Sequence, residues 1–322
     1  MILRLLRFSH THWKNVPLSS IVIRELLRNR MDELNLYKEP KLRNPFMVAA
    51  WPGMGGVAII AARYLTEQWD AQDLGSIAPE GFFDINGVLI EDNVVRDIEF
   101  PENKFYVAKG HGRRDWIIFI GESQPIMNGY GMANLVLDVA EKFEVKKLFT
   151  FAAAPTHIYH TKKPRVLAVA TKPRLVKWLQ KYDVAPLKQG SISGLNGLVL
   201  GVAKQRNLDS FCLLGEIPIY TTHIANPRSA KAVLQVLAQM ANLKIDLSDI
   251  DSWARETSAQ IEEKIYHLKE SFGEEAKELV DYFVRLAEQT GEDEIGPEFK
   301  TEELLKEIER FLKDKGEQKG SN

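Results

Sequence analysis

The chain has 322 residues, of which 45% are hydrophobic and 27% charged, and its formal net charge is −2. These values fit a soluble globular protein with a sizeable core, built as one large domain with appendages or as two modest domains. The near-neutral balance argues against a nucleic-acid partner, and the lack of an uninterrupted run of 18 apolar residues argues against a membrane-spanning helix. The single cysteine, Cys212, cannot form a disulfide within the chain and is typical of a core residue in a cytoplasmic protein.

Charge is unevenly distributed along the chain. Residues 246–322 carry 22 acidic and 11 basic side chains, a net charge of −11, whereas residues 1–245 carry 22 acidic and 31 basic ones, a net charge of +9. This break predicts an acidic helical appendage on a mildly basic body. The appendage either presents a solvated face or docks on its own body, on a neighbouring subunit or on a partner.

Residues 1–38 are predicted to be a lead-in to the folded body. The first 30 residues have a net charge of +5, but they lack the continuous apolar segment and the small-residue cleavage site of a signal peptide. Met31 is an alternative start, in which case residues 1–30 are poorly ordered or do not belong to the native protein. Otherwise residues 19–31 would form a short amphipathic helix on the body.

From residue 39 to residue 245, apolar strands alternate with helices whose apolar residues recur near every 3.6 positions. Several strands are apolar throughout, which is typical of a sheet covered on both faces. The pattern predicts one three-layer α/β/α domain with a mostly parallel sheet. The expected strands are 46–51, 74–79, 103–110, 115–123, 146–156 (with its following loop), 165–171 and 210–218, and the expected helices are 56–69, 131–145, 173–183, 194–207 and 226–243.

One antiparallel element is expected within this body. Residues 82–101 alternate in parts between apolar and polar side chains, and they contain Asn86-Gly87. Asn-Gly is the preferred pair in a two-residue hairpin turn, so a hairpin is predicted to turn there.

After residue 245 the pattern is helical only. A helix that Ser248 can cap should be followed by a second one, which makes residues 246–292 an acidic helical hairpin, and residues 293–322 a linker, a last helix and a frayed tail. Because its apolar face cannot remain in water, we expect the first helix to lie on the body or on a neighbouring subunit. That face comprises Ile250, Trp253, Thr257, Ile261, Ile265, Leu268 and Phe272.

The glycine-rich turn between the first strand and helix of the body is a candidate phosphate site. Gly53-x-Gly55-x-x-Ala58 fits the alanine variant of the dinucleotide fingerprint. However, Pro52 stiffens the turn, the large Met54 stands between the glycines, and no acidic residue ends the next strand to bind a ribose. We therefore predict a tight packed turn that binds no nucleotide or other cofactor.

Two glutamates, Glu122 and Glu216, end predicted strands at the edge where α/β proteins usually bind ligands. They could act as a general base or a ribose ligand, with Glu122 paired to His111 or His157, or they could form caps and ion pairs. His157-x-x-His160 lacks a third ligand at useful spacing, so no metal site is expected and this segment is predicted to be a polar surface loop.

Four stretches occur in an order that resembles the proteasome assembly chaperone 2 (PAC2) family. They are "WPGMGGVA" (with Trp51, Pro52, Gly53, Met54 and Gly55), "NGYGMANLVLDVAEKF" (with Gly129 and Tyr130), "GSISGLNGLVLGVA" (with Asn196 and Gly197) and "LLGEIPIYTTHIANPRSAKAVLQVL" (with Glu216). The resemblance covers about residues 45–243. It implies a phosphorylase/hydrolase-like α/β/α fold in which the Pro-Gly-Met-Gly turn is a structural signature without an established phosphate role.

The resemblance also implies a non-catalytic role, because eukaryotic and archaeal members help to assemble or bind the proteasome core particle. Members of the family are often oligomeric, and a homotrimer is expected here. Many dock through a C-terminal hydrophobic-Tyr-any tripeptide, whereas this sequence ends Gly320-Ser321-Asn322, so docking by such a tail is not expected. The helical hairpin is similar to that of bacterial members.

Related folds act on nucleosides, so an enzyme of phosphorylase or hydrolase type is the alternative. It would gather Glu122, Glu216 and the backbone amides of residues 52–56 around a pocket at the strand ends. We favour the binding protein over the enzyme.

Overall fold

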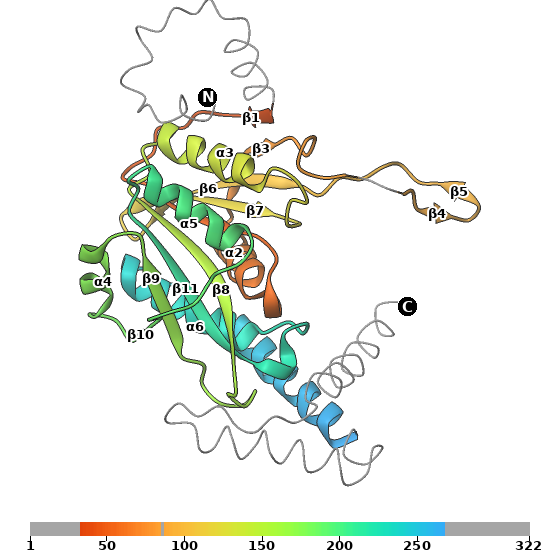
Figure 1. Cartoon of the computed structure of the whole chain (residues 1–322), viewed down its shortest axis with the longest axis vertical. Helices are drawn as coiled ribbons and strands as arrows, with labels where there is room; N and C mark the ends of the chain where they lie inside the picture. The colour runs from red at the N-terminus through yellow and green to blue at the C-terminus, as the bar shows by residue number, and fades with distance from the viewer. Residues whose placement is uncertain (1–32, 85–86, 268–322) are drawn as a thin grey trace, which may run out of the picture.

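The computed structural model of the chain describes residues 33–84 and 87–267 (Figure 1). Its main strands are β1 (Leu34–Leu36), β2 (Phe46–Ala50), β3 (Gln72–Ile77), β6 (Asn103–His111), β7 (Arg114–Gly121), β8 (Lys147–Thr156), β9 (Val166–Ala170), β10 (Ala185–Pro186) and β11 (Ser210–Pro218). Its helices are η3 (Met54–Gly56), α2 (Val57–Gln68), α3 (Gly129–Lys142), α4 (Pro173–Leu179), α5 (Leu195–Gln205), η4 (Ile219–Thr221) and α6 (Pro227–Ala241). Residues 248–267 form a further helix.

The nine strands form one mixed sheet in the order β1-β3-β6-β7-β2-β8-β11-β9-β10. The four central strands, β7, β2, β8 and β11, run parallel. The flanking pairs β3–β6, β6–β7 and β9–β11 are antiparallel. Every residue of β2 and β11 is buried, which explains why these strands are apolar nearly throughout. The predicted α/β fold with a largely parallel sheet is confirmed, with antiparallel strands added at its flanks.

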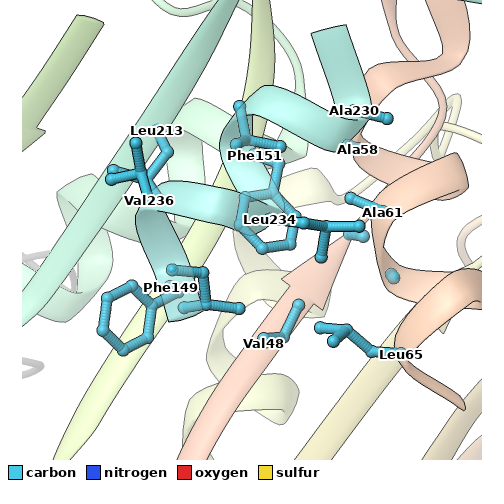
Figure 2. Close-up of a cluster of buried hydrophobic side chains, with 14 of the residues drawn as sticks. Val48, Ala58, Ala61, Leu65, Phe149, Phe151, Leu213, Ala230, Leu234 and Val236 are labelled. Carbon is cyan, nitrogen blue, oxygen red and sulfur yellow. The ribbon is translucent and has the colours of Figure 1, made fainter. Parts of the chain in front are cut away.

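Helices cover both faces of the sheet. On one face, α2 and α6 bury side chains such as Leu65 and Leu234 against Val48 and Phe149 (Figure 2). On the other face, α3 and α5 pack against the alternate residues of the same strands, among them Met47. Successive side chains of β2 therefore enter two different cores, as the period of a strand requires.

The helix at residues 248–267 lies on the body of its own chain. Ile250, Ala254, Ile261 and Ile265 are all buried. Thr257 and Ser258 are buried as well. Trp253 is 42% exposed, so its predicted place on the buried face is wrong, because at 100° per residue it lies at the margin of the face that these residues form. The remainder of the predicted hairpin, and residues 293–322, lie outside the described residues. Within residues 33–84 and 87–267, no helix combines the length and apolarity needed to cross a membrane.

A small hairpin projects from the body between β3 and β6 (Figure 1). It consists of β4 (Ile90–Glu91) and β5 (Val94–Val95). This hairpin turns at Asp92-Asn93, where φ is +49° and +63°, whereas Asn86 of the predicted Asn86-Gly87 turn lies outside the described residues. Two consecutive positive φ values are what a two-residue hairpin turn of this twist requires, and Asp and Asn adopt them more readily than most residues.

Candidate functional site

The carboxyl edge of the central sheet gathers most of the candidate residues. β2, β7, β8 and β11 end there, and α2, α3, α5 and α6 begin there. The turn Trp51–Gly56 lies in the middle of this edge, after β2. Segments far apart in the sequence therefore meet at the turn.

Asn196 in the first turn of α5 holds the end of β2. Its Oδ1 accepts a hydrogen bond from the Trp51 backbone N–H at 2.9 Å, and its Nδ2 donates one to the Trp51 carbonyl at 2.9 Å. Both residues are buried. The neighbouring Gly197 allows the preceding loop to pack on α5, because a Cβ there would lie 1.9 Å from the Ile192 carbonyl oxygen. Asn196 and Gly197 thus fix α5 at the end of the central strand.

A second amide side chain, Gln124 in the loop after β7, links the same elements. Its Nε2 donates to the Pro52 carbonyl at 2.7 Å, and its Oε1 accepts from the Leu195 N–H at 2.9 Å. Sequence reasoning missed Gln124, because a polar residue in a loop carries no local signal of such a contact. The turn is therefore tied to α5 through two separate amides.

Gly55 joins the turn to the connection between β11 and α6. It has φ of +62°, its N–H donates to the Thr222 carbonyl at 2.6 Å, and its carbonyl accepts from the Asn226 N–H at 2.8 Å. A Cβ on Gly55 would lie 3.0 Å from Asn226 Nδ2. Asn226 immediately precedes α6, but its side chain makes no cap; its Nδ2 donates instead to the Thr221 and Ile224 carbonyls. Glycine is needed here for both the positive φ and the close approach.

These contacts bear on the question of a phosphate cradle. A cradle needs free backbone N–H groups aimed at the ligand. Here the N–H groups of Gly55 and Gly56 already donate to the Thr222 and Gly53 carbonyls. This favours the packed-turn interpretation of residues 52–56. Their failure to bind nucleotides remains a prediction.

Glu122 lies just after β7 at this edge. Its Oε2 accepts from the Glu102 N–H at 2.9 Å, and its Oε1 lies 3.9 Å from Arg63 Nη2. It lines an open pocket of about 360 Å³ together with Arg63, Glu102, Lys104 and Tyr106. His111, one predicted partner of Glu122, instead stacks on Trp69.

Glu216, on β11, lies in a different environment. Its side chain is buried, and its Oε1 accepts from Arg165 Nε at 3.0 Å and from Nη2 at 2.7 Å. Its Oε2 accepts from the Arg165 N–H at 2.9 Å. Neither Glu216 nor the 52–56 turn lines the pocket of Glu122. The structure therefore does not assemble the predicted catalytic group around that pocket.

Gly129 and Tyr130 begin α3. A Cβ on Gly129 would lie 3.3 Å from the Leu195 side chain and 3.6 Å from that of Leu198, so the glycine allows α3 to start close against α5. Tyr130 is 53% exposed, and its hydroxyl donates to Gln205 Oε1 at 2.9 Å. Both residues position α3 and α5, and Tyr130 also contributes to the molecular surface.

His160 is buried and belongs to a polar network that the sequence did not reveal. Its Nδ1 lies 2.9 Å from the Tyr220 hydroxyl, and its Nε2 lies 2.8 Å from Glu262 Oε2, which also accepts from the Tyr159 hydroxyl at 2.9 Å. Burial lowers the pKa of His160, and the Glu262 carboxylate partly opposes this shift. The predicted polar surface loop is wrong at His160, because the helix at residues 248–267 covers it.

Comparisons with known proteins agree with this geometry. The chain is 26% identical over 245 residues to an uncharacterized protein of Methanocaldococcus jannaschii, a match that covers 74% of this chain and 92% of that protein. It is similar to Pyrococcus furiosus PbaB, described as an archaeal proteasome activator, with 29% identity and a TM-score of 0.61 over 71% of this chain and 97% of that one.

Pyrococcus furiosus PbaA, an archaeal homolog of proteasome-assembly chaperone, has the same fold at 24% identity, with a TM-score of 0.56 over 71% of this chain and 94% of that one. The PAC2 family model matches residues 47–265, a span that takes in the sheet except β1 and the first residue of β2, its covering helices and most of the helix at 248–267. Because this match covers more than half of the chain, the protein belongs to the PAC2 family.

Proposed function

We propose that this chain is a non-catalytic binding protein that acts on a proteasome-type partner. The observation that carries the proposal is the similarity to PbaB, described as an archaeal proteasome activator, at 29% identity over 97% of that chain. Family membership supports it, since residues 47–265 match the PAC2 model.

The geometry favours this function over the phosphorylase or hydrolase alternative. Such an enzyme needs its polar groups to converge on one pocket. Glu216 accepts hydrogen bonds from Arg165, and Glu122 lines a separate open pocket. The N–H groups of Gly55 and Gly56 donate to protein carbonyls. The edge is thus organised as a rigid scaffold, which suits a protein that presents its outer surface to a partner.

Self-association is part of the proposal. We expect the chain to act as a homo-oligomer, a trimer, in a reducing cytoplasm. Cys212 is buried, and burial raises its pKa to about 12. Its thiol is therefore unreactive, and we expect it to take no part in function.

The test of the partner is direct binding. The purified full-length chain is titrated against the proteasome core particle of its own host, with a chaperonin ring of comparable size as the control, and complexes are quantified by sedimentation velocity. We expect a core-particle complex with a dissociation constant of about 10 μM or tighter, and none with the chaperonin. Absence of a complex at about 100 μM chain would overturn the proposal.

A second measurement separates the enzyme alternative. Thermal unfolding is followed with ATP, NAD and nucleosides for the wild type, Glu122→Gln and Glu216→Gln. The proposed function predicts no ligand-dependent shift in the melting temperature. A shift of several degrees in the wild type that disappears in both variants would favour the enzyme.

A further inference from the structure

The segment that projects from the body, residues 87–100, is here called the arm. All of its residues are exposed, although half of them are apolar. We infer that the arm of one copy of this chain docks on the carboxyl edge of the body of a second copy. This inference rests on the self-association included in the proposed function, and it names the two surfaces that meet.

The arm has the composition of an interface and not of a solvated hairpin. Its apolar side chains are between 37% and 72% exposed, none of them belongs to either core, and the segment that carries them projects from the body (Figure 1). A contiguous exposed apolar surface of this kind marks an interaction site on a soluble protein. The apolar members are Val88, Leu89, Ile90, Val94, Val95, Ile98 and Phe100.

The arm is also acidic. Glu91, Asp92, Asp97 and Glu99 are opposed only by Arg96, which pairs with Glu91, so the arm carries a net charge of −3. Its complementary surface should therefore be apolar at its centre and electropositive around it.

The body offers such a surface at the carboxyl edge, between the starts of α3 and α5. Ile126, Met127, Tyr130 and Leu198, here called the edge patch, are between 37% and 71% exposed. A Cβ on Gly129 would lie 3.6 Å from the Leu198 side chain, which places Leu198 beside the start of α3, next in the chain to the other three residues. Two of the patch residues lie in the loop before α3, and the methionine can adapt its shape to a partner.

The electrostatics of the edge patch match those of the arm. α3 and α5 both begin beside it, and neither helix has an acidic residue in its first turn. The partial positive charge of both helix N-termini is therefore not offset from within the helices. Glu122, the nearest acid along the chain, is held by the Glu102 N–H and faces Arg63.

The placement of the arm favours a second copy as the occupant. Phe82, which precedes the arm in the chain and is here called its root, is held beside the edge patch, since its carbonyl accepts from the Ile126 and Met127 N–H groups at 2.9 and 3.2 Å. From this root the arm extends away from the body (Figure 1). Its tip is roughly 20 Å from its base at the rise of a β-strand, so it reaches beyond its own patch to a neighbour placed against the same edge.

The experiment uses thiol cross-linking of the full-length chain. Val94→Cys on the arm is mixed with a mass-tagged Ile126→Cys on the edge patch and treated with a short bifunctional thiol reagent. The native Cys212 is fully buried, so it does not react. The matched control replaces Ile126→Cys with Val176→Cys, which is exposed on α4 and whose helix starts beside Asp209 at the opposite edge of the sheet.

We expect the arm–patch mixture to give about tenfold more covalent heterodimer than the control mixture. We also expect Leu89→Asp/Val95→Asp to raise the dissociation constant of self-association about tenfold or more, measured by light scattering. Equal cross-linking in both mixtures, or self-association that is unchanged by the arm variant, would overturn the inference.

Two further outcomes would also overturn it. One is a chain that stays monomeric at all concentrations. The other is a cross-link that forms only within single chains of Val94→Cys/Ile126→Cys, since the arm would then fold back on its own body. The partner is assayed separately: a chain that fails the cross-linking test but binds the core particle contradicts this inference alone, whereas a cross-linking chain that binds no core particle contradicts the proposed function alone.

Discussion

Two segments leave the same edge of the sheet and differ in their contacts: one is hydrogen-bonded to the rest of the protein, and the other is exposed to solvent. The turn at Trp51–Gly56 bonds its backbone to Asn196, Gln124, Thr222 and Asn226. The arm at 87–100 keeps its apolar side chains in solvent. Glycine has a different use in each: Gly55 is surrounded by protein, whereas nothing lies within 4 Å of a Cβ placed on Gly87. The turn therefore stabilises the fold by joining several elements, whereas the exposed arm is available to bind a partner.

The largest expected effect tests how strongly the turn is tied. Asn196→Ala leaves the buried N–H and carbonyl of Trp51 without partners, so the free energy of unfolding should fall by about 3 kcal/mol. Urea titration measures this. The control is Asn35→Ala on the exposed face of β1, which should change it by less than about 0.5 kcal/mol. Equal effects of the two substitutions would show that the hydrogen bonds between Asn196 and Trp51 contribute little to the free energy of unfolding.

The two glycines give a matched pair. Gly55→Ala must hold a side chain at φ of +62° and 3.0 Å from Asn226 Nδ2, so it should destabilise the fold by about 2 kcal/mol. Gly87→Ala has no positive φ and no neighbour, so it should change the free energy of unfolding by less than about 0.5 kcal/mol. If Gly87→Ala proves as costly as Gly55→Ala, the arm is not the free segment described above.

Acidification should act on the body and spare the arm, which contains no histidine. Burial lowers the pKa of His160 in the fold, and Glu262 only partly offsets this. As the pH falls below about 6.5, the unfolded chain binds a proton that the folded chain resists, so the free energy of unfolding should decrease by up to about 1.4 kcal/mol per pH unit.

His160→Gln should flatten this dependence. Burial also lowers the pKa of His111, which therefore contributes to the same pH dependence of the free energy of unfolding. His111→Gln serves as the comparison. Urea titrations at several pH values between about 7 and 5 resolve the two shares. A slope of the opposite sign, or one unchanged by both variants, would contradict the direction given for these pKa values.

The smallest expected effect concerns the arm itself. Leu89→Asp removes an apolar group that is already 72% exposed, so the free energy of unfolding should change by less than about 0.5 kcal/mol. Loss of more than about 1 kcal/mol would mean that the arm packs on the body of its own chain, and the contrast with the turn would fail.

The strands and helices followed from the sequence where one local pattern dominated. β2 and β11 lie between two helical layers and are buried throughout. Their continuous apolar runs therefore predicted buried strands correctly. The turn of the β4–β5 hairpin was not predicted, because Asp92-Asn93 and Asn86-Gly87 both carry turn-forming residues and local chemistry does not choose between them. Trp253 was misassigned because a helix with a narrow buried face can leave a large aromatic residue outside it.

The site was less predictable than the fold, because its contacts are long-range. Glycines near Trp51 suggested a special turn, but its partner Asn196 is 145 residues away and looks like any polar residue at a helix start. His160 looked like a loop residue because the groups that bury it, on Tyr220 and Glu262, come much later in the chain. Such pairings depend on the packing of whole elements, which no local pattern encodes.

Hydrogen exchange of the full-length chain, followed by mass spectrometry at low and high protein concentration, tests the contrast between turn and arm most directly. Amides of Trp51, Gly55 and Gly56 should exchange slowly at both concentrations, since they donate to protein acceptors. Amides of residues 87–100 should exchange quickly at low concentration and slow down as the concentration rises and a second copy covers them. A turn that exchanges as quickly as the arm, or an arm whose exchange does not depend on concentration, would contradict the account.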